Sequence, residues 1–310
     1  MTPTFKRRFL VAFLALLLTF VTIELGLRAA GAILAKRATA EAVQRHGEGP
    51  TILAIGESTT AGLGVSRKES YPRQLEQSLR KHYSNPSIQV VYPWAIGRNS
   101  SQQLNRISRY LEAFEPDLVL LMCGVNNPWS LEESNITQFI EDDDSVSRRI
   151  RFRQLIDKSR LAKLIRLALI DLRYVMDDLR GKPEEGKWPP PSWILDWRDE
   201  HREEFLQLWR SDIGAMIERS LRSGAQVALM TYPRYEFPPP EEFRDLAAKY
   251  DVPLINIHRA FRTRLKRSEL SDYFLEDGYH PNPQGYKLLA DEILLRIVEL
   301  DSLGLNAEDP

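Results

Sequence analysis

The chain has 310 residues, of which 43% are hydrophobic and 27% are charged, and its formal net charge at pH 7 is −1. This length exceeds one typical domain, and the interspersed acidic and basic residues give no basic face of the kind that binds nucleic acid. The single cysteine, Cys123, lies in an apolar run. One thiol excludes an intrachain disulfide and a cysteine-rich metal site, so we interpret Cys123 as a core residue. We expect one folded domain with appended segments.

Residues 1–35 are predicted to form a membrane anchor. Basic residues at 6–8 precede an apolar run over 9–23, and extending this run through Glu24 and Arg28 gives the length that a spanning helix needs. The long Arg28 side chain can reach the interface. Positive charge before the span retains that end in the cytoplasm. We therefore expect the rest of the chain outside the cytoplasm, in the periplasm if the source is a Gram-negative bacterium.

Two alternatives remain open for this segment. A cleaved signal peptide is one, because Ala38-Thr39-Ala40 has the small-x-small pattern of a cleavage site. A buried helix of a soluble protein is the other, although such helices keep a polar face and only Thr19 and Thr22 are polar within 9–23. Residues 36–50 are polar and charged, which is typical of a linker.

Residues 51–303 are predicted to form an α/β domain, followed by a tail over 304–310. Helical patterns separate five short apolar runs, which favours a mainly parallel five-stranded sheet covered by helices. The runs are Thr51–Ile55, Ile88–Tyr92, Leu118–Cys123, Ala225–Thr231 and Pro253–Ile257. The expected helix faces contain Leu75 and Leu79; Leu104, Ile107, Leu111 and Phe114; and, in a last helix over 283–300, Leu288, Leu289, Ile293, Leu294 and Ile297.

Residues 127–200 are too long for an ordinary strand-to-helix connection and are interpreted as a helical insertion. An acidic run over 141–144 precedes a basic and apolar stretch over 148–169 that fits an amphipathic helix. Three interpretations stay open for this helix. It lies on anionic headgroups of a membrane, it forms a lid over the site, or it is a solvated helix packed on the domain. The prolines at 189–191, with Trp188, Trp193 and Trp197, predict a rigid loop with exposed aromatic surface.

Small or polar residues follow each of the first three predicted strands. Ser58 follows Ile55-Gly56-Glu57, and Gly97 and Asn126 follow the second and third strands. Ligand sites of open α/β sheets lie at these carboxyl ends. Ser58 is a candidate nucleophile, Gly97 lets backbone approach a ligand, and Asn126 can donate to an oxyanion. Each also has a structural interpretation, as a helix N-cap, a turn glycine and a turn asparagine.

Asp277-Gly278-Tyr279-His280 lies directly before the last predicted helix. A carboxylate three residues before a histidine can orient the imidazole and stabilise its charged form. A lone histidine is more often structural, but this one accompanies the serine, glycine and asparagine segments. The four segments together indicate a nucleophile–base site.

In residue type and chain order these segments resemble the SGNH hydrolases, also called the GDSL family of esterases and lipases. The resemblance implies a three-layer α/β/α, flavodoxin-like fold. It also implies that Ser58 is the nucleophile, that His280 is the base with Asp277 behind it, and that Ser58, Gly97 and Asn126 form the oxyanion hole. Neither a metal nor an organic cofactor is then expected. The location predicted above, outside the cytoplasm, favours an ester on a cell-envelope glycan or lipid as the substrate.

The sequence departs from the family pattern at two positions. Glu57 replaces the aspartate of G-D-S, and Asn127 replaces the aspartate of G-x-N-D. The second change leaves open how the amide of Asn126 is held. Two further functions also stay open: an O-acyltransferase acting on an envelope polysaccharide, and a membrane-anchored assembly module without activity.

Overall fold

The computed structural model describes residues 3–45, 49–140, 144–165, 168, 201–234, 237–266 and 270–301. Five parallel strands form one sheet in the order β2-β1-β3-β4-β5. They are β1 (Thr51–Gly56), β2 (Gln89–Val91), β3 (Leu118–Met122), β4 (Gln226–Met230) and β5 (Leu254–Ile255). Each overlaps one of the five predicted runs, so the predicted parallel sheet is confirmed. This order is that of flavodoxin-like folds.

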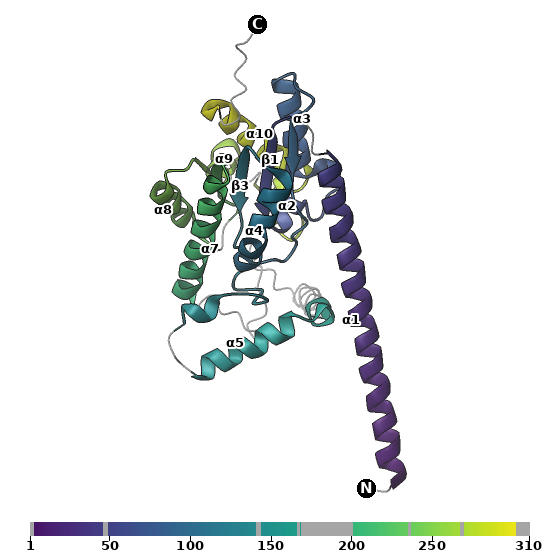
Figure 1. The fold of residues 1–310 in the computed structure, drawn as a ribbon. Helices are drawn as coiled ribbons and strands as arrows, with labels where there is room; N and C mark the ends of the chain where they lie inside the picture. Colours follow the sequence, from purple (N-terminus) through teal and green to yellow (C-terminus); the bar gives the residue numbers. More distant parts are fainter. Residues whose placement is uncertain are drawn as a thin grey trace.

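Helices cover both faces of the sheet (Figure 1). One group has α10 in contact with α3 and α9, and the other has α7 in contact with α4 and α8. The first group is α3 (Tyr71–His82), α9 (Ile257–Arg264) and α10 (Pro283–Leu300), and the second is α4 (Ser100–Phe114), α7 (Arg202–Arg222) and α8 (Pro240–Tyr250). Short helical turns are α2 (Ser58–Ala61), η1 (Arg67–Glu69), η2 (Ile136–Gln138) and η3 (Leu270–Tyr273). The three-layer architecture is therefore confirmed.

The main core lies between the sheet and these helices. The β1 side chains are all buried, as expected for a central parallel strand. In α10, Leu289, Ile293 and Ile297 are buried, and Leu288 and Leu294 pack against the same core. Each fully buried aliphatic side chain contributes about 1.5–3 kcal/mol. The predicted inward face of the last helix is thus confirmed.

The helix α1 (Pro3–Arg45) runs beside the domain and extends beyond it toward its N-terminus (Figure 1). Its stretch Arg7–Ile33 is long and apolar enough to cross a membrane. The helix continues through most of the predicted linker 36–50, so that segment is largely helical. Good helix formers such as alanine, glutamate and arginine occupy this stretch, which accounts for the continuation.

The first part of the insertion packs against the domain through a second, smaller core. This core joins η2 and α5 (Asp144–Asp157) to α7, and its buried members are Leu131, Ile136, Ile150, Phe205, Leu206, Leu208 and Phe237. The single helix predicted over 148–169 is wrong in detail, because α5 ends at Asp157 and a new helical turn begins after Ser159. The Trp-flanked prolines at 189–191 and the tail 304–310 lie outside the described residues.

Candidate active site

Ser58 lies at the junction of β1 and α2, where the first parallel strand ends. The junction is tight: a Cβ on Gly56 would lie 2.0 Å from Oγ1 of Thr60 and 2.7 Å from the carbonyl oxygen of Met122. Glycine is therefore required two residues before Ser58. The Ser58 side chain remains partly accessible. This is the position in which an open α/β sheet presents a reactive group to a ligand.

His280 connects Ser58 to Asp277. Its Nε2 lies 2.8 Å from Oγ of Ser58, and its Nδ1 lies 2.6 Å from Oδ2 of Asp277. Because the carboxylate accepts the Nδ1 hydrogen, Nε2 is left as an acceptor for the serine hydroxyl. The side chains of His280 and Asp277 are 18% and 27% exposed, so a substrate can reach the pair. The structure therefore brings together the three residues that the sequence selected as nucleophile, base and orienting acid.

A compact turn fixes Asp277. Its Oδ1 accepts hydrogen bonds from the backbone N–H groups of Tyr279 and His280, at 2.8 and 3.0 Å. Partial burial alone would raise the pKa of Asp277, but the hydrogen bonds from His280 and from the two backbone groups outweigh it and hold the pKa below its usual value. Gly278 supplies the left-handed φ of 70° that the turn needs. The carboxylate therefore stays ionised beside the imidazole.

Gly97 and Asn126 lie on two loops that are joined to each other. Nδ2 of Asn126 donates to the carbonyl oxygen of Arg98 over 3.1 Å, and Gly97 has a left-handed φ of 70° with open space where a Cβ would lie. No hydrogen bond among the described residues joins either of them directly to Ser58. One amide hydrogen of Asn126 is used internally and the other is left for a ligand.

Glu57 is a site residue that the sequence identified only as a departure from the family pattern. It is 1% exposed; its Oε1 accepts from the backbone N–H of Gly124 at 2.5 Å and its Oε2 accepts from the Tyr232 hydroxyl at 2.6 Å. The Tyr232 oxygen in turn accepts from the backbone N–H of Val125. Glu57 thus ties the end of β1 to the loop of Asn126. The sequence signal that could have identified Glu57 is its position, because it is a carboxylate directly after an apolar strand.

Asn127 replaces the family aspartate and holds the same loop from the other side. Its side chain accepts from the backbone N–H of Ser100 and donates to the Ser100 hydroxyl, both at 2.8 Å. Asp212 of α7 accepts from the hydroxyls of Ser100 and Ser101 at 2.6 and 2.7 Å. The loop of Asn126 is therefore anchored to the first turn of α4, which accounts for the Asn127 substitution.

Because Glu57 is buried, the stability of the protein is expected to depend on pH. Burial raises the pKa of Glu57 from 4.5 to about 8, against the opposing hydrogen bonds from Gly124 and Tyr232. The folded state therefore binds the proton more tightly than the unfolded chain, and this stabilisation is complete below pH 4.5 and is lost as the pH rises toward 8. At about 1.4 kcal/mol per unit, the loss is at most about 5 kcal/mol.

The variant Glu57→Gln keeps the size and the acceptor oxygen for Gly124 but cannot ionise. Thermal unfolding of the full chain in detergent, followed by circular dichroism between about pH 5 and pH 8.5, should show a smaller change in midpoint for this variant than for the parent. The exposed Glu112→Gln variant is the matched control and should follow the parent. Equal pH dependence in Glu57→Gln would contradict the assignment.

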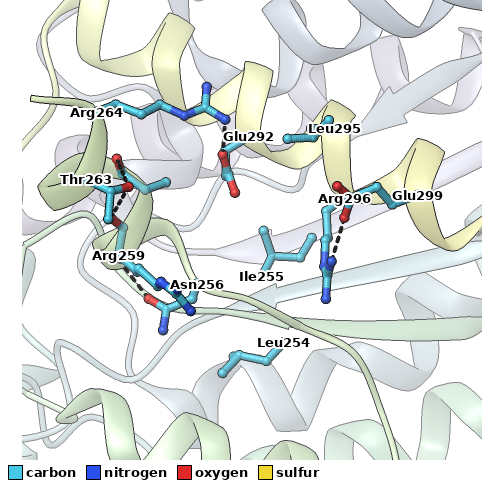
Figure 2. A pocket seen from close by; sticks show the side chains of 11 residues that line it. Leu254, Ile255, Asn256, Arg259, Thr263, Arg264, Glu292, Leu295, Arg296 and Glu299 are labelled. Carbon is cyan, nitrogen blue, oxygen red and sulfur yellow. Dashed lines mark hydrogen bonds and ion pairs between the residues drawn. The ribbon is translucent and has the colours of Figure 1, made fainter.

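A separate groove of about 330 Å³ lies between β5, α9 and α10 (Figure 2). Arg264 of α9 pairs with Glu292 of α10, and Arg296 pairs with Glu299 within α10, both at 2.5 Å. None of the residues selected from the sequence lines it. The candidate active site is therefore the Ser58 region at the carboxyl ends of the strands and not this groove.

Comparison with known proteins gives a family match and several structural neighbours. The profile of the GDSL-like lipase/acylhydrolase family matches residues 54–288. No curated protein sequence matches the chain. The chain is similar to the psychrotrophic esterase EstA from Pseudoalteromonas sp. (19% identity, TM-score 0.47, covering 81% of this chain and 97% of that one). It is also similar to a mutant of Axe2, an acetyl-xylooligosaccharide esterase from Geobacillus (17%, TM-score 0.49, 82% and 96%).

A third similar structure is the lipase/acylhydrolase from Enterococcus faecalis, with 15% identity and a TM-score of 0.48, covering 81% of this chain and 96% of that one. The family match spans β1 to α10 and so includes the strand ends that carry Ser58, Gly97 and Asn126, and also the turn of His280. Over this range the chain belongs to the GDSL-like lipase/acylhydrolase family and is an ester-cleaving hydrolase.

Proposed function

We propose that this hydrolase is a membrane-anchored serine esterase that cleaves an O-acyl ester of a cell-envelope glycan or lipid. The observation that carries the proposal is the continuous chain of hydrogen bonds from Ser58 Oγ through His280 to Asp277. A serine hydroxyl is a weak nucleophile until an adjacent base accepts its proton. His280 is positioned for that role, since Nε2 is the nitrogen without a hydrogen.

In the acylation step Ser58 Oγ attacks the ester carbonyl while its proton moves to His280 Nε2. Asp277, which stays ionised, stabilises the imidazolium that forms. The imidazolium then donates the proton to the departing alkoxide, and the acyl group remains on Ser58. In the second step His280 takes a proton from water, whose oxygen attacks the acyl carbonyl. The bond between the acyl carbon and Ser58 Oγ then breaks, the acid is released, and the imidazolium returns the proton to Ser58 Oγ.

The negative oxygen of each tetrahedral intermediate needs hydrogen-bond donors fixed before the reaction. We assign this role to the backbone N–H groups of Ser58 and Gly97 and to the second Nδ2 hydrogen of Asn126. The bonds through Glu57, Tyr232 and Asn127 support the assignment, because they hold the Asn126 loop in one position. Donors fixed in this way stabilise the developing charge without reorganisation.

The apolar stretch Arg7–Ile33 supports the anchor. The contacts of Glu24 with the backbone of Arg160 and Leu161 support a helix that is retained in the mature protein, because cleavage near residue 40 would remove them. Basic residues before the span favour a catalytic domain outside the cytoplasm. In that location glycans and lipids of the envelope are the accessible esters.

Covalent labelling tests the nucleophile directly. The full chain in detergent is treated with a fluorophosphonate probe, and the modified peptide is identified by mass spectrometry. We expect the adduct on Ser58, no adduct in Ser58→Ala, and normal labelling in Ser87→Ala, in which an exposed serine is replaced. Hydrolysis of short-chain p-nitrophenyl esters should follow the same pattern. Normal turnover by Ser58→Ala would overturn the mechanism.

The oxyanion role of Asn126 gives a separate prediction. Asn126→Ala is expected to lower kcat for ester hydrolysis about 10²–10³-fold with little change in KM, because the lost hydrogen bond acts mainly in the transition state. Steady-state kinetics of this variant and of Asn105→Ala, an exposed asparagine on α4, measure the effect. An unchanged kcat in Asn126→Ala would exclude its side chain from the oxyanion hole.

A further inference from the structure

The two sides of α5 differ in their surroundings. One side carries Ile150, Arg153 and Asp157, which are buried against the domain. The opposite side presents Phe152, Leu155 and Ile156, whose exposed fractions are 62%, 64% and 37%. Their spacing of three and four residues places them on one stripe of the helix. An exposed apolar stripe of this kind is typical of a surface that contacts a protein or a membrane.

The helical turn that follows α5 also exposes apolar side chains. It exposes Leu164 and Ile165, at 50% and 49%. Within the part of the chain that the structure describes, the other exposed large hydrophobic residues outside α1 are scattered over the domain: Leu63, Trp94, Leu221, Leu295 and Leu300. The five side chains of α5 and the following turn, which we call the apolar stripe, are therefore a local concentration.

The turn after α5 is joined to α1 by Glu24. Its carboxylate accepts hydrogen bonds from the backbone N–H groups of Arg160 and Leu161 and from the Ser159 hydroxyl, at 2.9–3.0 Å. Arg28, which bonds to Glu24 over 2.6 Å, also donates to the carbonyl oxygen of Lys158. The carboxylate thus satisfies the free N–H groups at the start of a helix, as a capping side chain does.

This contact determines where the apolar stripe lies along the length of α1. Glu24 lies inside the apolar stretch Arg7–Ile33, nine residues before its end, which is about 14 Å along a helix. Figure 1 shows α5 running across the direction of α1, at the end of the domain that faces the N-terminal part of α1. The part of α1 from Arg7 to Glu24 is about 26 Å long, close to the thickness of a hydrocarbon core. If this part spans the bilayer, α5 lies along the surface of that bilayer.

Basic side chains accompany the stripe. Arg148, Arg151, Lys158 and Arg160 are exposed on α5 and at the start of the next turn. Apolar side chains combined with arginine and lysine are typical of helices that lie in the interface of a membrane with anionic lipids. The charge therefore favours lipid over a second apolar protein surface as the partner of the stripe.

We infer that α5 and the turn over 159–165 form a second membrane contact, with the apolar stripe among the acyl chains and the neighbouring basic residues among anionic headgroups. This inference rests on the anchor of the proposed function. The two contacts, joined by Glu24, fix the orientation of the catalytic domain and hold the Ser58 site at a set height above the bilayer. The site then reaches esters within a narrow layer next to the membrane.

Fluorescence quenching in vesicles tests the contact. Full chains carrying Leu155→Cys or Ile156→Cys are labelled with the environment-sensitive fluorophore NBD and reconstituted in phosphatidylcholine–phosphatidylglycerol vesicles with or without brominated acyl chains. Cys123 is buried, so the parent chain measures background labelling. Arg222→Cys is the exposed control at the far end of α7, about 30 Å from the end that packs beside α5.

We expect brominated lipid to quench both α5 labels strongly and the Arg222→Cys label weakly. A label at Leu16→Cys, inside the apolar stretch Arg7–Ile33 of α1, reports on the anchor itself. Quenching at Leu16 but not at Leu155 or Ile156 would overturn the inference and leave the anchor intact, whereas no quenching at Leu16 would overturn both. Blue-shifted α5 labels that brominated lipid does not quench would show a protein partner or a second copy instead and would also overturn it.

Discussion

His280→Ala is expected to lower kcat for ester hydrolysis by about 10⁴–10⁶-fold, the range seen when the base of a serine–histidine pair is removed. Nothing else among the described residues contacts Ser58 Oγ as a base, because its hydrogen bond over 2.8 Å goes to His280 Nε2. Without the imidazole the hydroxyl keeps its proton in the attack. The loss should lie in kcat, since the imidazole contributes little to binding of the ground state.

The measurement is steady-state hydrolysis of a p-nitrophenyl ester by the full chain in detergent. His82→Ala, which replaces an exposed histidine at the end of α3, is the matched control and should keep the parental rate. Added imidazole should restore part of the activity of His280→Ala, because a small base fits the space that the variant opens. A decrease below tenfold in kcat would show that another group acts as the base.

Asp277→Asn is expected to lower kcat about 10⁴-fold while leaving the fold intact. An amide in this position presents an N–H group toward Nδ1, so His280 must place its own hydrogen on Nε2 and can no longer accept from Ser58. The amide oxygen still accepts the backbone N–H groups of Tyr279 and His280, so the turn is kept. The expected loss of activity therefore comes from the changed tautomer of His280 and the lost charge at position 277, and not from a change in the fold.

Two readouts separate this role from a structural one. Circular dichroism and the thermal midpoint of Asp277→Asn should stay close to those of the parent, and the loss of activity should lie in kcat with KM nearly unchanged. Asp272→Asn, an exposed carboxylate on η3, is the control and should be fully active. An Asp277→Asn variant with parental kcat at neutral pH would remove Asp277 from the mechanism.

The sheet and the last helix were predictable from local sequence. Five apolar runs fixed the strands, and the spacing of Leu289, Ile293 and Ile297 fixed the buried face of α10, because side-chain periodicity directly reflects which face is covered. The positions of Ser58, Gly97 and Asn126 at strand ends, and of His280 directly before the last helix, followed from the same pattern. Their catalytic roles stay predictions until the variants are measured.

Long-range contacts were not predictable in this way. Nothing near Glu57 in sequence indicates that its carboxylate binds Gly124 and Tyr232, which are brought to it by β3 and β4. The helix predicted over 148–169 is likewise broken near Ser159 where Glu24, which lies 135 residues away, caps the second segment. Such bonds depend on how the elements assemble, and a local pattern contains no information about them.

The bond between Ser58 and His280 joins positions that are 222 residues apart, and α10, which directly follows His280, packs on α3. During synthesis from the N-terminus, the serine therefore emerges long before its base. Until the last helix docks, Ser58 lacks its hydrogen bond to His280, so we expect the nascent chain to have no esterase activity as it is made. Proteolytic removal of the C-terminal helix and its preceding turn would return the enzyme to that inert state.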